Sequence, residues 1–354
     1  AEVRMMYELL LSLPLAINLA FFALLASGIW YSGFHLTLLA DELSDRLNLA
    51  KSTVGLVFLA LATSLPEVAT TLTGAIADDA DLVLNNLFGG IALQTAILAI
   101  ADFWARGAIT NYPRKADHAL EAILLIALLA IVQAAFVLHE PMTILNIGLG
   151  SLIIGLAYVA TLLLLRHYSE NNDWVPVDMP PKSDLSSIRA TRASSSKATT
   201  QRLVLLGILA CCAILFLGTG LVVSAEVLSA KTGLGSSFIG VTLVALATSL
   251  PELSTTITAV RMGAYTMAIS NIFGSNLIML VLVLPADALY RKGPILREDS
   301  ASAQLAIALG MLLTTIYLVG LIIRRKPRIG HLGIDSAMVL VAYLAGLFLF
   351  YIVK

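Results

Sequence analysis

The sequence is poor in charge and in cysteine, and each shortage excludes a class of protein. Only 13% of its 354 residues are charged, whereas about 25% is usual for a soluble domain. Its two cysteines, Cys211 and Cys212, are adjacent in an apolar segment, which fits neither a disulfide framework nor a spaced metal site. The net charge is −1 and there is no basic tract, so nucleic acid is not an expected partner.

Catalytic signatures are also missing. The chain has no zinc-binding motif, no glycine-rich phosphate loop with its lysine, and no sequence arrangement of Ser, His and Asp that is typical of hydrolases. These gaps argue against an intramembrane enzyme and against a pump driven directly by ATP. We expect neither enzymatic activity nor a bound cofactor, and the sequence implies no protein partner.

Apolar residues are what the chain has in excess: 58% of it is hydrophobic and the mean hydropathy is +0.90. Windows of about 20 apolar residues match the thickness of a bilayer. They predict an all-α membrane protein with ten transmembrane helices, whose surroundings are the lipid bilayer. The expected spans are 9–38, 53–76, 82–105, 118–138, 143–165, 203–227, 237–260, 265–289, 301–323 and 334–353. The first is long enough to be tilted or to begin with an interfacial turn before Pro14.

Residues 167–201 interrupt this pattern. The stretch is rich in Asn, Pro, Ser, Thr, Lys and Arg, and it cannot bury enough apolar area to fold alone. We interpret it as a cytoplasmic linker between two five-helix halves, residues 1–166 and residues 202–354.

Lysine and arginine are distributed unevenly over the expected loops. With ten spans, 16 of the 22 Lys and Arg residues fall on the side away from the termini. Positively charged loops stay in the cytoplasm. Both termini are therefore expected outside the cytoplasm, in a multi-pass protein of the cell (inner or plasma) membrane.

An internal repeat dominates the sequence. Residues 60–67 and residues 245–252 both read Ala-Leu-Ala-Thr-Ser-Leu-Pro-Glu, and 17 of 48 positions are identical between 55–102 and 240–287. Five expected spans separate the copies, and an odd number makes the two halves enter the membrane in opposite senses. The sequence thus predicts an inverted repeat with interrupted helices, a pattern typical of secondary transporters.

Each copy of the repeat gathers oxygen atoms on one helix face. Ala60, Thr63 or Ser64, and Glu67 share that face, while Pro66 loosens the turn before it and frees backbone carbonyls. A carboxylate at this depth costs roughly 2.5–3.5 kcal/mol on insertion scales, so it needs a partner or a purpose. Oxygen ligands suit hard cations such as Na⁺ and Ca²⁺. The second copy presents the same set as Ala245, Thr248, Ser249 and Glu252.

The next span of each half adds amides and small residues. The first half has Asn86 followed by two glycines, and the second has Asn271, then Gly274-Ser275-Asn276. The amide oxygens could serve as neutral ligands, or the side chains could join neighbouring helices by hydrogen bonds. The sequence leaves both readings open.

These motifs together resemble the cation/calcium exchanger superfamily, and in particular its sodium/calcium exchanger branch. The resemblance rests on the doubled Ala-Leu-Ala-Thr-Ser-Leu-Pro-Glu and on the Asn-x-x-Gly-Ser-Asn element downstream, and it covers both repeats. It implies alternating access, with two helices sliding against a core of the other eight. It also implies that the transported ions are held by the matching positions, which are Ala60, Thr63, Ser64, Glu67, Ala245, Thr248, Ser249 and Glu252.

The chain departs from the family pattern at two places. The family usually has Gly-Ser-Asn in each half and an Asn or Asp four residues after that Ser. Here Gly90 takes the place of the first Ser, and the later positions are Gln94 and Met279. Gln94 still offers an amide oxygen, whereas a methionine sulfur suits neither Na⁺ nor Ca²⁺. Asn86, Gln94, Asn271 and Ser275 complete the set of expected metal ligands.

A secondary antiporter is the function that these features favour. We expect it to exchange a divalent cation, Ca²⁺ by the family resemblance, against Na⁺. Exchange against H⁺, or of another divalent such as Mg²⁺ or Mn²⁺, is the alternative, because fewer ligands suit simple protonation of the two glutamates. A passive channel is a third hypothesis, although it does not need an inverted repeat with broken helices.

Several polar residues near span ends have other expected roles. Asp102 and Asp287, at matching positions, are expected to cap or anchor their spans. Asp41 and Glu226 are expected to anchor their helices at the interface or to act in gating. No histidine lies at metal-site spacing from a carboxylate, so we expect all five at the interface.

Overall fold

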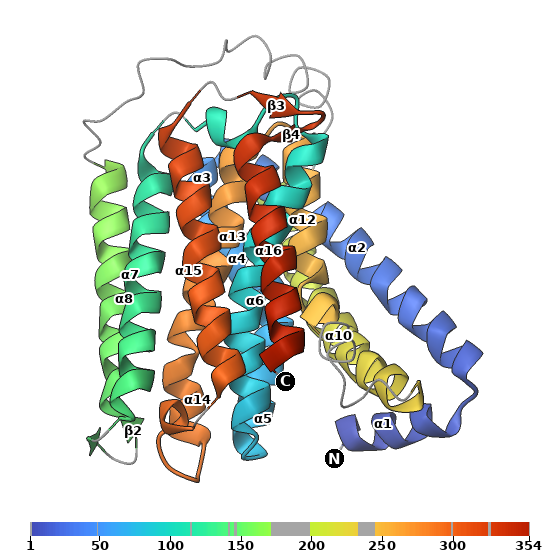
Figure 1. Ribbon diagram of the computed structural model, residues 1–354. Helices are drawn as coiled ribbons and strands as arrows, with labels where there is room; N and C mark the ends of the chain where they lie inside the picture. Colours follow the sequence, from blue (N-terminus) through green and yellow to red (C-terminus); the bar gives the residue numbers. More distant parts are fainter. Residues whose placement is uncertain are drawn as a thin grey trace.

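The computed structural model describes most of the chain as helices that run side by side (Figure 1). The described residues are 2–47, 49–113, 115–140, 142–144, 147–170, 199–232, 245–298, 300–324 and 327–353. The central part of the expected linker lies outside them. Both termini lie toward the same end of the bundle in Figure 1.

The first half of the chain forms a series of helices and one hairpin. They are α1 (Glu2–Ser12), α2 (Leu15–Arg46), α3 (Lys51–Thr53), the π-helix η1 (Val54–Leu59), α4 (Ala60–Thr63), α5 (Leu65–Ile76), α6 (Ala80–Ala101), the 3₁₀ turns η2 (Asp102–Trp104) and η3 (Ile109–Asn111), α7 (Asp117–Leu138), the strands β1 (Thr143–Ile144) and β2 (Ile147–Gly148), and α8 (Leu149–Glu170).

The second half follows the same order. Its described elements are α10 (Thr200–Lys231), α12 (Leu250–Arg261), α13 (Tyr265–Val281), α14 (Val283–Leu289), the 3₁₀ turn η4 (Ile295–Arg297), α15 (Ala301–Ile322), the strands β3 (Arg328–Ile329) and β4 (Leu332–Gly333), and α16 (Ile334–Val353). In both hairpins the strands pair antiparallel, and each hairpin leads directly into the last helix of its half.

Seven helices in the described ranges are long and apolar enough to cross a membrane, and there are up to eight if a bent pair counts as one span. That pair is 51–63 with 65–76, bent by 49°. A shorter apolar helix covers Ile334–Phe350. The expected span at 237–260 begins outside the described residues. The chain is thus a helical membrane protein of several spans.

The N-terminal region turns before Pro14, which is one of the two forms expected for the span at 9–38. The helix α1 ends at Ser12 and α2 runs from Leu15 to Arg46. Pro14 stands between them and has no N–H to continue a helix, which explains the corner. The Asn18 amide donates to the Leu10 carbonyl at 2.9 Å and closes this corner.

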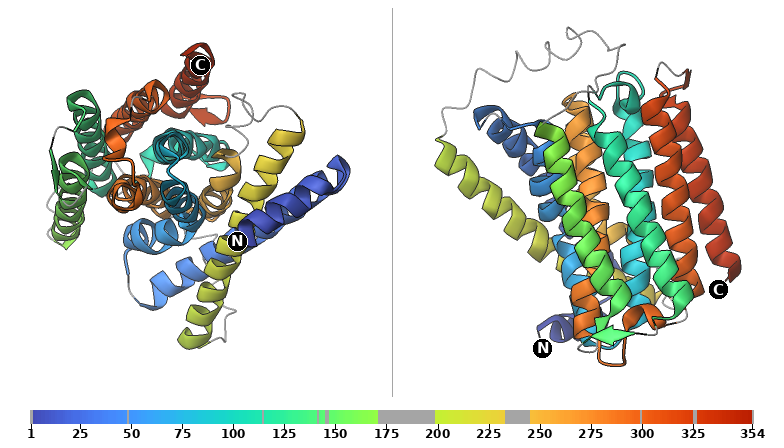
Figure 2. Two further views of the ribbon diagram at one scale, coloured as in Figure 1. Left: turned by 90° about the horizontal axis from the view of Figure 1, so that it is seen from below. Right: turned by 90° about the vertical axis from the view of Figure 1, so that its left-hand side faces the viewer.

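The helices form a buried centre and a pair that leans away from it. In the most apolar stretches of α6 and α13, 78% and 83% of residues are buried, against 17% in α2. The helices α7, α8, α15 and α16 lie around the centre, whereas α2 and α10 lean away from it together (Figures 1 and 2). A small apolar cluster joins this pair, with Leu25 and Ile29 of α2 against Leu221 and Ala225 of α10, and it also includes Ala247 of the second motif.

Two buried aspartates at the ends of the centre tie the halves together. Asp102 accepts the backbone N–H of Ile109 at 2.7 Å and that of Gly333 at 2.6 Å. Its counterpart Asp287 accepts those of Ile295 at 2.6 Å and Gly148 at 2.7 Å. The expected anchoring role is confirmed, and each aspartate holds the hairpin of the opposite half.

A second carboxylate accompanies Asp287 at its end of the bundle. Glu140 lies in the loop after α7, outside the spans, and its side chain is buried. Burial and the neighbouring Asp287 carboxylate raise the pKa of Glu140 to about 7, although backbone hydrogen bonds and Arg297 oppose the shift. The protonated form of Glu140 is thus favoured by the fold.

This raised pKa predicts a pH-dependent stability. Because the folded pKa lies above the unfolded value, the stabilising proton is fully bound below the unfolded pKa and is lost as pH rises through about 7. Thermal unfolding in detergent should therefore show a midpoint that falls across this range. Glu140→Gln should flatten the fall, and the exposed Asp81→Asn variant should keep the wild-type profile. If the unfolding midpoint of Glu140→Gln fell with pH as steeply as that of the wild type, Glu140 would not be the group responsible.

Candidate functional site

The first copy of the repeated motif forms a helix that breaks in its middle. The chain passes from η1 into α4, bends at Ser64, and continues as α5 with Pro66 in the first turn. Proline cannot donate the hydrogen bond that would join the two segments. The π-helix η1 precedes α4, one turn before the break, and such segments are common at functional sites.

The second copy repeats this break where it is described. Ser249 precedes α12 with φ −86° and ψ 8°, close to the −79° and 4° of Ser64 before α5. Pro251 again occupies the first turn of the new helix. Identical local sequences thus give the same local backbone in both halves.

Glu67 and Glu252 lie in the first turns of α5 and α12, and both side chains are fully buried. The positive end of each short helix favours a negative charge there. The two carboxylates are near enough for Glu252 to repel charge on Glu67. The structure therefore brings together the two acidic residues that the repeat singled out.

Hydroxyl groups from both halves surround Glu252. The Ser64 hydroxyl donates to its Oε1 at 3.4 Å, and the hydroxyls of Thr63 and Ser275 lie beside the same carboxylate. Thr63 Oγ1 and Ser275 Oγ are 3.5 Å apart, and Ser275 also donates to the Ala60 carbonyl at 3.5 Å. Thr63, Ser64 and Ser275 thus lie beside Glu252, and the Ala60 carbonyl is linked to it through Ser275.

The remaining members of the second motif are described from residue 245 onward. Thr248 is buried and donates to the carbonyl of Ala245 at 2.9 Å, so this carbonyl is already engaged. The Ser249 hydroxyl is buried, and no partner within the described ranges reaches it. Ser249 is therefore available to a ligand, whereas Ala245 and Thr248 bond to each other.

The two asparagines join neighbouring helices through their amide nitrogens. Asn86 on α6 donates to Thr71 Oγ1 on α5 at 3.0 Å, and Asn271 on α13 donates to Thr255 Oγ1 on α12 at 3.1 Å. Asn271 can both join the helices and act as a ligand, because its buried side-chain carbonyl oxygen has no partner among the described residues.

Gln94 and Met279 contact each other across the centre. Gln94 Nε2 donates to Met279 Sδ at 3.9 Å, and both side chains are fully buried. The Gln94 amide oxygen receives no donor from the described part of the chain. The amide oxygen of Gln94 is thus available to a ligand, while its amide nitrogen is hydrogen-bonded to Met279.

Close helix packing places the broken helix against α13. A Cβ atom on Gly274 would lie 2.7 Å from the Cβ of Ala60 and would also meet the Leu56 carbonyl. Only glycine permits this approach, so α13 can bring Ser275 next to the break. The same kind of contact occurs at Gly55, where a Cβ atom would lie 2.5 Å from the Met267 carbonyl.

Sequence reasoning missed a buried polar cluster between α7 and α13. His118 Nδ1 lies 2.9 Å from Glu121 Oε2, and the Ser270 hydroxyl donates to Glu121 Oε1 at 2.9 Å. All five histidines were expected at the interface, but His118 is buried beside Glu121. The i, i+3 spacing of His118 and Glu121 on one helix was the available signal.

This cluster is not arranged like the triad of a hydrolase. Ser270 Oγ lies 3.1 Å from the same Nδ1 atom that contacts Glu121. A triad uses opposite ring nitrogens for the serine and for the carboxylate. The cluster therefore lacks the proton path that a nucleophilic serine requires.

Asp41 is engaged in an ion pair. Lys51 at the start of α3 contacts the carboxylate of Asp41 and lies 3.3 Å from that of Asp45. These contacts tie the end of α2 to the beginning of the broken helix.

The sequence of this chain is similar to those of known membrane proteins. A family model described as sodium/calcium exchanger protein matches residues 17–166 and 202–353. The inner membrane protein YrbG of Escherichia coli is 27% identical over 302 residues, which cover 85% of this chain and 87% of YrbG. The sodium/calcium exchanger MaX1 of Methanosarcina acetivorans is 38% identical over 80 residues, or 22% of this chain and 23% of MaX1.

A solved structure has the same fold. The sodium-calcium exchanger NCX_Mj, soaked with Na⁺ and Sr²⁺, matches with a TM-score of 0.67 and 17% identity, covering 95% of this chain and 99% of that chain. The likeness extends over both halves of the bundle.

The tight contact at Gly274 generates a prediction. Gly274→Ala should lower the free energy of unfolding by about 1–3 kcal/mol, because the added methyl group meets a backbone carbonyl and Ala60. Gly207→Ala on α10 is the control, since its Cβ atom would make an ordinary contact of 3.6 Å with Phe58. Chemical or thermal unfolding in detergent measures both. Equal stability of the two variants would show that α13 does not pack tightly against the broken helix at Gly274.

Proposed function

Because the chain belongs to the sodium/calcium exchanger protein family, we propose that it is a secondary antiporter that exchanges a divalent cation against Na⁺. Ca²⁺ is the favoured divalent ion, since it is the ion named for the family and for the relative MaX1. The observation that carries the proposal is the pair of buried glutamates, Glu67 and Glu252, at the two helix breaks.

The atoms around this pair fit a cation. They are buried oxygens that no donor in the described residues reaches, and buried acceptors without a donor are costly. A hard cation would satisfy them. The oxygens are both carboxylate atoms of Glu67, Glu252 Oε2, Ser249 Oγ, and the amide oxygens of Gln94, Asn271 and Asn276.

The proposed ligand set is the one expected from the sequence, with Asn276 added. Glu67 and Glu252 provide charge, Ser64, Ser249 and Ser275 provide hydroxyls, and the remaining positions provide amide and backbone oxygens. Thr63 and Ser275 also order the carboxylate of Glu252. Ala245 and Thr248 contribute least, because they bond to each other.

Charge compensation couples the two ion fluxes. Two carboxylates without a cation would have to carry uncompensated charge through the apolar part of the bundle, which is strongly unfavourable. A loaded site, with its charge neutralised, can change the side to which it is open. Exchange follows if the divalent ion and its counter-ions load the same site in turn.

The helix pair α2 and α10 is suited to move during this change. These helices share an apolar cluster that also includes Ala247 of the second motif, and glycines mark where they cross the two breaks. A Cβ atom on Gly218 of α10 would lie 2.5 Å from Pro66, and one on Gly33 of α2 would lie 2.7 Å from Ser254 Oγ. Sliding of the pair would therefore act directly on the segments that carry Glu67 and Glu252.

We further propose the full topology expected from the sequence. Ten spans form two inverted five-helix repeats, residues 1–166 and residues 202–354, with 167–201 as a cytoplasmic linker and both termini outside the cytoplasm. The repeated break and the crossed anchors of Asp102 and Asp287 support this arrangement. The protein works in a cell membrane as a transporter and has no enzymatic role.

Exchange against H⁺ is the second candidate, because Met279 replaces an oxygen ligand and leaves the glutamates with fewer partners. Other divalent ions such as Mg²⁺ or Mn²⁺ belong to the same alternative. A passive channel is less favoured, since a fully buried carboxylate pair provides no continuous path.

Flux through proteoliposomes tests the function. Uptake of ⁴⁵Ca²⁺ should follow an outward Na⁺ gradient, and uptake driven only by an H⁺ gradient would select the proton alternative. Glu67→Gln and Glu252→Gln should each abolish exchange, because each removes one of the two negative charges that neutralise the bound cation. Glu42→Gln, which alters an exposed pair with Arg46, should transport like the wild type. Uptake without dependence on either counter-ion would indicate a channel.

A further inference from the structure

The two glutamates of the candidate site have unequal surroundings. Three hydroxyl groups, from Thr63, Ser64 and Ser275, lie beside Glu252. Neither carboxylate oxygen of Glu67 receives a hydrogen bond from the described residues. The halves are related by sequence, yet the ligands they offer are not equivalent.

One substitution between the halves accounts for one of these three hydroxyls. Gly90 stands where the related half has Ser275, so one hydroxyl is missing on this side. A Cβ atom on Gly90 would lie 2.7 Å from Met279 Cε and 2.9 Å from Met279 Sδ. The end of the Met279 side chain therefore occupies the space that a larger residue at position 90 would need.

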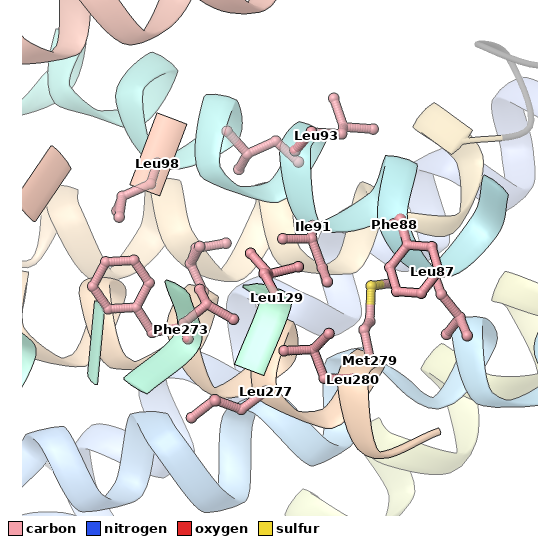
Figure 3. Packing of buried hydrophobic residues seen from close by; sticks show 14 of the residues in the cluster. Leu87, Phe88, Ile91, Leu93, Leu98, Leu129, Phe273, Leu277, Met279 and Leu280 are labelled. Atoms are coloured by element: carbon pink, nitrogen blue, oxygen red, sulfur yellow. The ribbon is translucent and has the colours of Figure 1, made fainter. Parts of the chain in front are cut away.

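Met279 makes this side of the site apolar. Its side chain is fully buried and belongs to the apolar cluster that includes Phe88, Ile91 and Leu280 (Figure 3). The Gln94 amide nitrogen points at its sulfur. A thioether is a soft ligand that Na⁺ and Ca²⁺ do not prefer. The space against Gly90 is thus closed to a hard cation.

The charge of the site then limits how many ions it can carry. Glu67 and Glu252 supply two negative charges, which one divalent ion or two monovalent ions neutralise. A third monovalent ion would leave a net positive charge in the buried site. A third ion would need neutral oxygens beyond those of Ser249, Gln94, Asn271 and Asn276, which the proposed site already uses, and Gly90 and Met279 provide none.

We propose that this protein exchanges one divalent cation for two monovalent cations, and that Met279 packed on Gly90 determines this ratio by closing the site to a third. Transport is then electroneutral. The inference rests on the proposed function, but it concerns the coupling ratio, which can fail while exchange itself holds.

Counting displaced ions tests the ratio without transport. Detergent-solubilised protein, loaded with ²²Na⁺, is titrated with Ca²⁺ while released Na⁺ and released protons are both measured. The sum should be two per Ca²⁺ bound. A sum of three or of one overturns the inference and leaves the exchanger assignment intact. Failure to bind Ca²⁺ overturns the Ca²⁺ assignment and this inference with it.

Flux at a clamped membrane potential gives a second measurement. In proteoliposomes with K⁺ and valinomycin, the final ⁴⁵Ca²⁺ distribution should not change with potential. One net charge per cycle would shift that distribution about 50-fold for about 100 mV. A shift of that size overturns the inference.

Variants of the two residues separate a specificity role from a structural one. Gly90→Ser combined with Met279→Asn adds neutral oxygens, so the released sum should rise to three and transport should become potential-dependent. Met279→Leu is the matched control that keeps the space apolar, and it should stay at two. A double variant that folds, binds Ca²⁺ and still releases two ions contradicts the role of Met279. If the double variant does not fold, the numbers of ions released per Ca²⁺ by the wild type and by Met279→Leu decide whether the ratio is two.

Discussion

The burial of two acidic side chains near each other, Glu67 and Glu252, is the constraint on which the rest of the structure depends. Such a pair is strongly unfavourable in an apolar bundle unless cations compensate it. The breaks before α5 and α12 present a helix N-terminus to each carboxylate, which lowers this cost. Glycines at 55 and 274 bring the neighbouring helices close enough to supply hydroxyl and amide oxygens. The architecture can be understood as a means of holding charge where lipid would otherwise exclude it.

The bundle combines a buried centre with a pair of helices that leans away from it. The centre, α6 and α13, is almost entirely buried and carries the amide side chains. The pair, α2 and α10, reaches the breaks through Gly33 and Gly218, through the hydrogen bond from Ser254 to the Trp30 carbonyl, and through the apolar cluster that includes Ala247. The proposed alternation of access would need both parts, since ligands have to stay in place while the two sides open in turn.

Local sequence was sufficient for the helical class, for most span positions and for the break at Pro66, because proline chemistry and apolar run length act within one helix. It also anticipated the anchoring role of Asp102 and Asp287. It allowed for a turn before Pro14, but it did not anticipate the contact of His118 and Glu121 with Ser270, which joins residues 149 or more positions apart. Nor could it show that Met279 fills the space against Gly90. Contacts between distant helices depend on packing that no local pattern encodes.

The crossed anchors of Asp102 and Asp287 bear on how this chain can fold and evolve. Each aspartate belongs to one half but satisfies the backbone of the hairpin in the other. Neither half, folded alone, would have a donor for the second oxygen of its aspartate or an acceptor for its own hairpin. Although the repeat reads as two copies of one unit, the copies are mutually dependent, as in an intertwined dimer whose subunits have been joined into a single chain.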